Sequence, residues 1–154
     1  MSIKNEIVVT DWIKRNPYEG DFIKLTLSSD QRRILRGKRK SDCNQELHLQ
    51  LPRGGKLSDG DTLLTNQKGI FVKIIAQKEN LIEITSKQNL ELIKVAYHLG
   101  NRHVEIEINE NILLIKSDYI IEEMLNNFEV NLVKVEKKFS PAKGAFHHEK
   151  KSLN

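Results

Sequence analysis

Histidines are the residues of this chain whose chemistry points to a function, because imidazole nitrogen is a ligand for nickel, copper and zinc. The chain has five of them, His48, His98, His103, His147 and His148. His103 is the most informative, since it shares the polar face of a predicted strand with Glu105 and Glu107, opposite Val104, Ile106 and Ile108. A packed core histidine would lie on the apolar face instead. Spacing alone leaves metal binding and simple surface exposure both open for His103.

The other histidines carry weaker signals. His98 lies five residues before His103 on a predicted helix, and five residues turn a helix by about 140°, so the two would not share a face. We expect His98 to pack or to form a hydrogen bond near the helix end, and keep it as a possible secondary ligand. His48 is expected to be exposed on a strand. His147 and His148 lie in a polar C-terminal segment, where a histidine pair binds transition metals loosely.

One chain alone offers too few ligands for a tight metal site. Transition metals take about four to six donors, and the folded part of the chain has one well-placed histidine. A two-fold dimer would place the two His103 side chains on either side of its axis. Tail histidines from both chains could then supply further nitrogens.

Known catalytic patterns are absent from the sequence. It contains no Cys-x-x-Cys, no Walker A loop, no Gly-x-Gly-x-x-Gly after a strand and no Gly-x-Ser-x-Gly. We therefore expect a protein that is not an enzyme. The single cysteine, Cys43, fits a reducing compartment. Neither a signal peptide nor an apolar run of about 20 residues is present, so we expect a cytoplasmic protein without a membrane segment.

The positive charge raises nucleic acid as a partner, because the chain carries a net charge of +4 and a pI near 9.1. Much of the charge lies in two clusters, within 32–40 and 137–151, which are expected to be solvated loops. An RNA-binding module is the alternative function. Such modules stack bases on aromatic residues of the central strands, and the strands expected to be central, 104–108 and 112–116, contain none. We therefore expect no nucleic-acid partner.

The first half of the chain reads as short strands separated by turns. Strands are expected at 6–10, 22–27, 46–51, 62–65 and 70–76. The clearest is 46–51, in which Leu47, Leu49 and Leu51 alternate with polar residues. These patterns predict a small all-β domain over residues 1–76.

The second half alternates strands with helices. Strands are expected at 81–85, 104–108, 112–116 and 130–135. A helix is expected over 89–99, with a stacked face of Leu90, Ile93 and Tyr97 and a left-handed cap at Gly100. A second helix is expected after an N-cap at Ser117, with Ile120, Ile121, Met124 and Leu125 on its apolar face. The predicted class is α+β, with a ferredoxin-like β-α-β-β-α-β domain over 77–139 and a flexible tail over 140–154.

Several motifs, taken in order, resemble the UreE family of urease accessory proteins. The segment Ala96-Tyr97-His98-Leu99-Gly100-Asn101-Arg102-His103 is similar to the signature of that family. Further similar segments are Leu51-Pro52-Arg53-Gly54, Leu57-x-Asp59-Gly60-Asp61, Asp118-x-x-x-Glu122-Glu123-Met124-Leu125 and Gly144-Ala145-Phe146-His147-His148. The set extends over more than a hundred residues and is therefore much more specific than any one motif.

The resemblance implies a homodimeric nickel metallochaperone. It implies a β-rich N-terminal domain, often considered a peptide-binding module, and a ferredoxin-like metal-binding domain. The central metal site would use His103 of both chains, joined by His147 or His148, and zinc or copper could substitute for nickel. Its expected partners are the urease accessory GTPase and the urease apoprotein complex.

The sequence also departs from the family pattern. Its tail has two histidines where some members have many, and Ser117 and Tyr119 stand where some members have histidines. Both differences imply few nickel ions per dimer. After His103 the usual Pro-x-Gln is replaced by Glu105-Ile106-Glu107.

Overall fold

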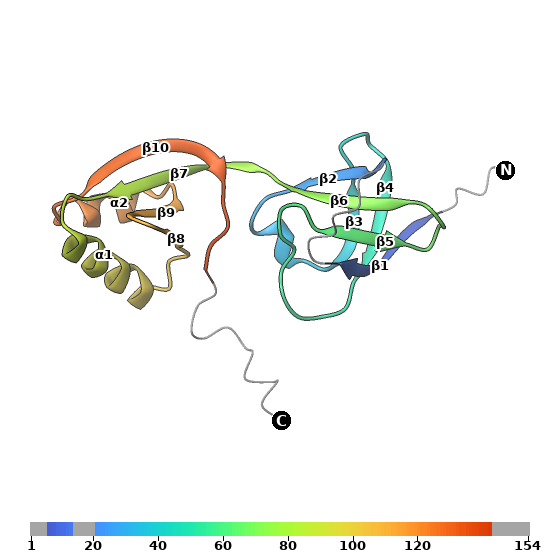
Figure 1. Ribbon diagram of the computed structural model, residues 1–154, viewed down its shortest axis with the longest axis horizontal. Helices are drawn as coiled ribbons and strands as arrows, with labels where there is room; N and C mark the ends of the chain where they lie inside the picture. The colour runs from blue at the N-terminus through green and yellow to red at the C-terminus, as the bar shows by residue number, and fades with distance from the viewer. Residues whose placement is uncertain (1–5, 14–20, 143–154) are drawn as a thin grey trace, which may run out of the picture. The chain divides into compact units, whose positions relative to one another are not determined.

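The computed structural model describes residues 6–13 and 21–142. Contacts divide the chain into two compact units, Met1–Gln77 and Lys78–Asn154, which we call the N-terminal and C-terminal units. The first is built on a mixed sheet and the second on another sheet with two α-helices (Figure 1). This confirms the predicted α+β class.

The N-terminal unit contains a six-stranded sheet in the order β2-β6-β5-β1-β4-β3. Its strands are β1 (Ile7–Ile13), β2 (Ile23–Leu27), β3 (Arg36–Lys40), β4 (Glu46–Gln50), β5 (Thr62–Thr65) and β6 (Phe71–Ala76), with a short 3-10 helix at Gln31–Arg33. The pairs β1–β4 and β2–β6 are parallel and the others antiparallel. Five of these strands match the predicted ones. The interpretation of 36–40 as loop is wrong: it is an edge strand, and its basic residues lack the apolar alternation that marks a strand.

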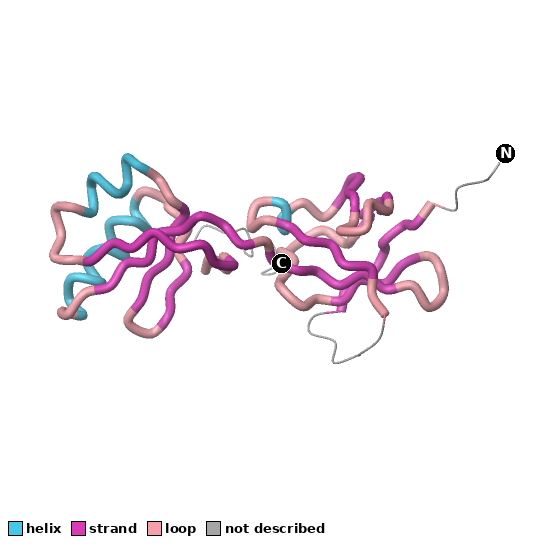
Figure 2. Tube along the Cα trace, turned by 90° about the horizontal axis from the view of Figure 1, so that it is seen from above, coloured by secondary structure: helices cyan, strands magenta, loops and turns pink. Residues whose placement is uncertain are grey.

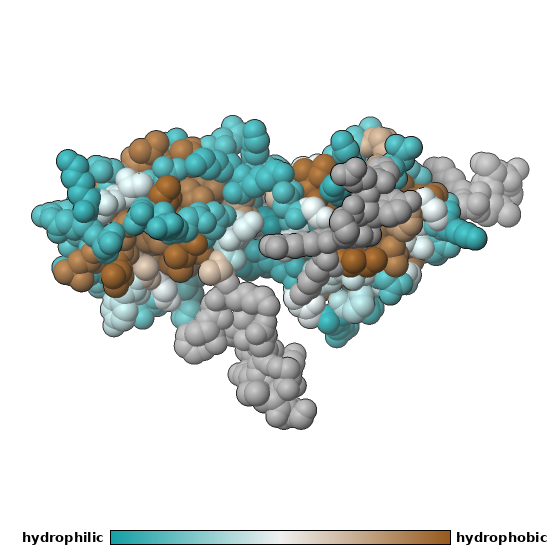
Figure 3. Space-filling model, in the orientation of Figure 1, coloured by the Kyte–Doolittle hydropathy of each residue, from teal (hydrophilic) through white to brown (hydrophobic). Residues whose placement is uncertain are grey.

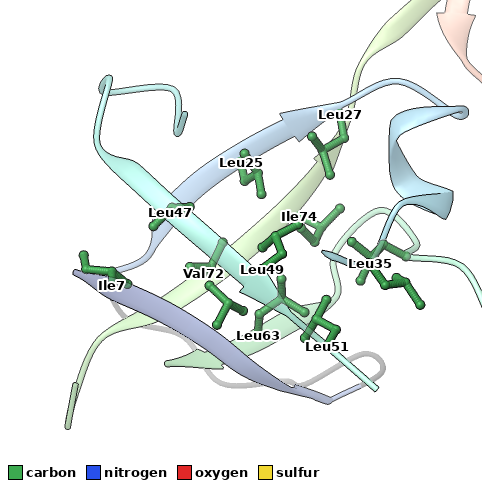
Figure 4. Packing of buried hydrophobic residues seen from close by; sticks show 12 residues of the cluster. Ile7, Leu25, Leu27, Leu35, Leu47, Leu49, Leu51, Leu63, Val72 and Ile74 are labelled. Atoms are coloured by element: carbon green, nitrogen blue, oxygen red, sulfur yellow. The ribbon is translucent and has the colours of Figure 1, made fainter. Parts of the chain in front are cut away.

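Leucines from alternating positions fill the interior of the N-terminal unit. Leu47, Leu49 and Leu51 are fully buried, and Leu25 and Leu27 meet them from β2 (Figure 4). Successive side chains of a strand point to opposite faces, so the alternating pattern places every second residue in this core. Burial of a leucine side chain stabilises the fold by about 1.5–3 kcal/mol.

The C-terminal unit has its elements in the order β-α-β-β-α-β. They are β7 (Lys78–Thr85), α1 (Asn89–Asn101), β8 (Glu107–Asn109), β9 (Ile112–Lys116), α2 (Tyr119–Leu125) and β10 (Asn131–Lys138), visible along the trace in Figure 2. The antiparallel sheet has the order β10-β7-β9-β8. Its central strands are β7 and β9, so the expectation that 104–108 forms a central strand is wrong. No helix in the described residues is both long and apolar enough to cross a membrane.

Helix α1 buries a different face from the predicted one. Leu92, Val95 and Leu99 pack against one face of the sheet together with Ile121 and Leu125 of α2. The predicted stack faces solvent, with exposed fractions of 59% for Leu90, 64% for Ile93 and 65% for Tyr97. The helix carries two apolar stripes, and periodicity alone does not say which of them meets the sheet.

Helix α2 begins one residue later than predicted. Asp118 is the N-cap, and its carboxylate accepts hydrogen bonds from the backbone N–H groups of Ile120 (2.9 Å) and Ile121 (3.2 Å). A carboxylate suits this position because it also interacts favourably with the positive end of the helix. The predicted cap at Ser117 is therefore wrong, and Ile120, predicted on the apolar face, is exposed.

Candidate metal centre

His103 occupies the turn that ends α1. Its backbone N–H donates to the carbonyl of Gly100 (3.0 Å), and the next N–H, of Val104, donates to Leu99 (3.0 Å). These two bonds form a Schellman motif, in which the residue just after the helix cap adopts a left-handed backbone. His103 accordingly has a φ of 57°. Val104 packs against the core beside Leu99, as the motif requires.

The predicted strand position of His103 is wrong. Residues 104–106 are not in a strand, and β8 begins only at Glu107. Ile106 is buried, whereas Ile108 is 61% exposed, so the expected alternation of faces does not hold. The chain has to reverse out of the helix before it can enter the sheet, and this turn takes up the residues that the pattern assigned to the strand. His103 is nevertheless exposed, as predicted.

The left-handed position belongs to His103 and not to Gly100, contrary to the sequence prediction. Gly100 lies inside α1. Among the described residues three non-glycines have a positive φ, namely Asn44, His103 and Asn111. Asparagine and histidine adopt this conformation more often than most non-glycine residues, yet a side chain there still costs about 1–2 kcal/mol relative to glycine. A glycine would be the stable choice at position 103, so the imidazole is retained at a cost in stability, as happens at functional sites.

The location of His103 favours a bound cation. The side chain lies just beyond the C-terminal end of a 13-residue helix. The last carbonyl groups of a helix carry partial negative charge, which stabilises a nearby cation by about 0.3–1 kcal/mol. One exposed imidazole beside such a helix end can serve as a first ligand for a transition metal.

His98, the possible secondary ligand, lies among aromatic rings. Its ring centroid is 5.3 Å from that of Phe128 and 5.5 Å from that of Tyr97. It therefore packs at the helix surface, as expected. His48 is in the other unit, where its Nδ1 lies 3.1 Å from a carboxylate oxygen of Glu6.

The described part of the chain does not by itself assemble a full ligand set. Within residues 6–13 and 21–142 no group of three or more His, Cys, Asp or Glu side chains is arranged to hold a metal ion. The predicted tail ligands His147 and His148 lie outside the described residues. The ligands that would complete a site around His103 must therefore come from the tail, from a second copy of the chain, or from solvent.

Sequence reasoning missed two hydrogen bonds to the segment that follows His103. The chain after β10 returns to the segment that follows the helix turn, where the N–H of Ala142 donates to the carbonyl of Ile106 (2.7 Å). The N–H of Ser140 also donates to Oε1 of Glu107 (2.7 Å). These partners are more than thirty residues apart, and no local pattern links them. A hint was present only in Phe139, an aromatic residue at the end of a strongly polar strand.

Comparison with known proteins identifies the family of the chain. Residues 79–153 match the family model described as UreE urease accessory protein, C-terminal domain. A urease accessory protein UreE of Prochlorococcus marinus subsp. pastoris is 78% identical over 154 residues, all of both chains. The protein of that name from Prochlorococcus marinus strain MIT 9215 is 64% identical over 149 residues, covering 97% of this chain and 100% of its own. Another from Synechococcus sp. strain WH7805 is 41% identical over 132 residues, covering 82% and 75% of the two chains. The chain belongs to the UreE family of urease accessory proteins.

Proposed function

We propose that this protein is a urease accessory metallochaperone that binds nickel at a homodimer interface and delivers it for assembly of the urease active site. In this proposal His103 of both protomers provides the central ligands, and His147 or His148 adds others. Zinc or copper can take the place of nickel, because imidazole binds all three. The protein acts as a carrier and not as an enzyme.

The strained backbone of His103 is the observation that carries the proposal. The residue has a φ of 57° in a helix-ending turn where glycine would be more stable. Its side chain is exposed, so packing in the protein core does not explain the choice of histidine. Metal coordination does explain it, because no other residue type offers a neutral nitrogen ligand with this affinity for nickel near pH 7.

An exposed apolar stripe supports the dimer. Leu90, Ile93 and Tyr97 lie three and four residues apart, which places them on one face of α1. Hydrophobic atoms accordingly reach the surface of the C-terminal unit around α1 (Figure 3). The same helix ends at Asn101, two residues before His103, so two copies that pair along this stripe with the two-fold axis near that end of the helix would have their His103 residues on the shared interface. A second copy would thereby supply a ligand that a single chain lacks.

The C-terminal unit is proposed to belong to the ferredoxin-like class. Its element order and its strand order, β10-β7-β9-β8, support that assignment. The same features motivated the RNA-binding alternative. Neither central strand, β7 or β9, contains an aromatic residue on which a base could stack. The helix-free face of the sheet is also partly covered by Phe139. We therefore favour the metal-binding function.

Family membership is the basis on which we propose partners, a location and domain roles for the protein. The proteins to which this chain is similar are named urease accessory proteins, and we propose the urease accessory GTPase and the urease apoprotein complex as partners. We also propose a cytoplasmic location, a peptide-binding role for residues 1–76, a metal-binding role for 77–139 and a ligand-bearing tail over 140–154.

Nickel titration of a conservative variant tests the central claim. His103→Asn removes the imidazole but keeps a residue that tolerates a left-handed backbone. Isothermal titration calorimetry should show the tightest nickel phase in the wild type and its loss in His103→Asn. His48→Asn is the matched control, because it removes a histidine from the other unit and should leave the tight phase unchanged. A tight phase that survives in His103→Asn would contradict the assignment.

A further inference from the structure

Strand β3 forms one edge of the N-terminal sheet and carries a row of basic side chains. Among the described strands it pairs with β4 alone. Every second residue, namely Arg36, Lys38 and Lys40, is exposed, and the side chain of Lys38 is 71% accessible. We call these three the edge residues. Because alternate side chains of a strand share a face, their charges lie side by side along the edge.

The backbone groups of the edge residues point away from β4. In an antiparallel pair, residues that exchange hydrogen bonds across the pair alternate with residues that do not. At one end of β3 the N–H of Leu51 donates to the carbonyl of Leu35 (3.1 Å), and at the other the N–H of Ser41 donates to Gln45 (2.9 Å). The odd-numbered positions of this strand therefore bond to β4. The N–H and C=O groups of the even-numbered edge residues face outward.

The opposite edge of the sheet is protected differently. Asp42 donates its N–H to the carbonyl of Lys24 (2.9 Å), and its carboxylate accepts from the N–H (3.0 Å) and the hydroxyl (2.7 Å) of Thr26. Lys24 and Thr26 belong to β2, the other edge strand. These outward groups of β2 already have partners, whereas the edge of β3 is guarded by positive charge.

We propose that the edge of β3 binds an acidic, extended segment of a partner protein, which joins the sheet as an additional strand. The inference deepens the proposed peptide-binding role of residues 1–76 and does not depend on the nickel site. In this mode of recognition, main-chain hydrogen bonds supply affinity and alternate side chains supply specificity. The carbonyl of Lys38 accepts from Nη1 of Arg39 (2.9 Å), a surface contact that an N–H of the added strand would replace.

Charge complementarity identifies the occupant as acidic. Residues 31–40 include six basic residues and no acidic one. Within the described residues an ion pair reaches Lys38, from Glu46 at 3.7 Å, and none reaches Arg36 or Lys40. Acidic side chains at alternate positions of an added strand would have Cβ atoms about 4.5–5.5 Å from those of the edge residues. The β3 edge of a second copy would place like charges opposite one another, which disfavours it.

A nucleic acid fits this edge less well than a peptide. The edge residues present both N–H donors and C=O acceptors, so a partner has to supply acceptors and donors at the spacing of a strand. A peptide backbone supplies both. A phosphodiester backbone supplies acceptors only, and its charge would lie beside the outward carbonyl groups. Binding of nucleic acid is therefore an outcome that the experiment has to separate.

Matched peptides test the proposal on the unaltered full-length protein, with a chelator present to exclude binding through metal. The probe is a capped peptide in which glutamate alternates with threonine, Thr-Glu-Thr-Glu-Thr-Glu-Thr. Its control has the same composition with the glutamates contiguous. Calorimetry should show that the alternating peptide binds about fivefold more tightly. Hydrogen exchange should show slower exchange of the N–H groups of the edge residues when this peptide is bound.

Methylation of the peptide backbone separates strand addition from simple charge attraction. Alternate N–H groups of a strand point to opposite sides, so only one set can face β3. The glutamate nitrogens are methylated in one peptide and the threonine nitrogens in another. One of the two should bind at least about tenfold more weakly, and the other within about twofold of the parent peptide. Equal effects of both, or binding that leaves the edge N–H groups unprotected, would overturn the inference.

A double variant tests the charges of the edge. Arg36→Thr with Lys40→Thr removes two of them and keeps residues that favour strands. Lys68→Thr with Lys87→Thr is the matched control, because it removes the same charge from exposed positions outside β3. The edge variant should bind the alternating peptide about fivefold more weakly, and the control as the wild type does. Equal weakening in both would overturn the inference, because net charge alone would then attract the peptide.

The remaining outcomes separate this inference from the proposed metal function. No binding of the alternating peptide, or tighter binding of a single-stranded oligonucleotide at the same edge residues, would overturn the inference and leave the nickel site unaffected. Nickel titration of the edge variant should match that of the wild type. A wild type that binds the peptide but no nickel would contradict the metal function alone. Because the peptide comparisons use the unaltered protein, they decide the question even if the double variant does not fold.

Discussion

Replacing His103 with glycine should stabilise the metal-free protein while it removes the nickel site. Glycine relieves the left-handed backbone at φ 57°, which is worth about 1–2 kcal/mol. It also makes the unfolded chain more flexible, which costs about 0.5–1 kcal/mol. The side chain of His103 is exposed, so little packing is lost. The midpoints of these ranges give a net gain of about 0.75 kcal/mol, or about 3–6 °C in Tm for a unit of this size.

The same substitution at His98 is the matched control, with the opposite expected sign. His98 lies inside α1, where glycine is less favourable than histidine by about 0.3–0.5 kcal/mol. It also loses its contact with the ring of Phe128. Urea and thermal denaturation followed by circular dichroism, with a chelator present and protein concentration held constant, would measure both changes.

Adding nickel should reverse the order of stability. A ligand that binds only the folded state at one hundred times its Kd stabilises that state by about 2.7 kcal/mol. The wild type gains this amount and His103→Gly does not, so the wild type becomes the more stable protein. The reasoning would be refuted if His103→Gly were less stable than the wild type without metal, or if nickel stabilised both proteins equally.

Three further results are expected. Ile93→Asp should convert the dimer to a monomer in sedimentation experiments and weaken nickel binding, whereas Val133→Asp, at a residue 52% exposed on β10, should do neither. Nickel affinity should fall steeply between about pH 7.5 and 5.5, because imidazole of pKa about 6.5 must lose its proton to coordinate, and replacing both tail histidines with alanine should flatten the curve in calorimetric titrations. The pKa of Glu91 is lowered by the N–H of Glu129, which donates to its carboxylate, and by Lys94. Glu91→Gln should therefore reduce stability above the ordinary carboxyl pKa of 4.5, and this loss should disappear as pH falls through the lowered value, as urea denaturation at pH 7 and pH 3 would show.

Local patterns predicted the elements better than their ends. The alternation of Leu47, Leu49 and Leu51 correctly placed them in the core, and 62–65 and 112–116 are strands with the predicted bounds. Strand β3 was missed because its residues, Arg36–Lys40, include no apolar side chain. It is a strand because β4 pairs with its backbone, and backbone hydrogen bonds do not depend on apolar side chains.

The candidate site shows the same contrast between what local sequence predicts and what the fold decides. The imidazole side chain of His103 and the motif around it identified this residue as the central candidate. Its predicted position in a strand, however, was wrong. Its left-handed backbone results from two hydrogen bonds back into the last turn of α1, which require the helix to end at Asn101. A glycine three residues earlier was the stronger local signal for a helix end, but Gly100 continues the helix.

The sequence by itself determined the α+β class, the order of the elements in the C-terminal unit and the family, because these depend on residue types and on the short periods of helices and strands. Only the tertiary structure decided which stripe of α1 is buried, leaving Leu90, Ile93 and Tyr97 exposed. It alone also brought Ser140 to Glu107, across 33 residues of chain. Burial depends on the surface that a segment meets, and a long-range hydrogen bond depends on two distant segments at once. Neither property is encoded in any single stretch of the sequence.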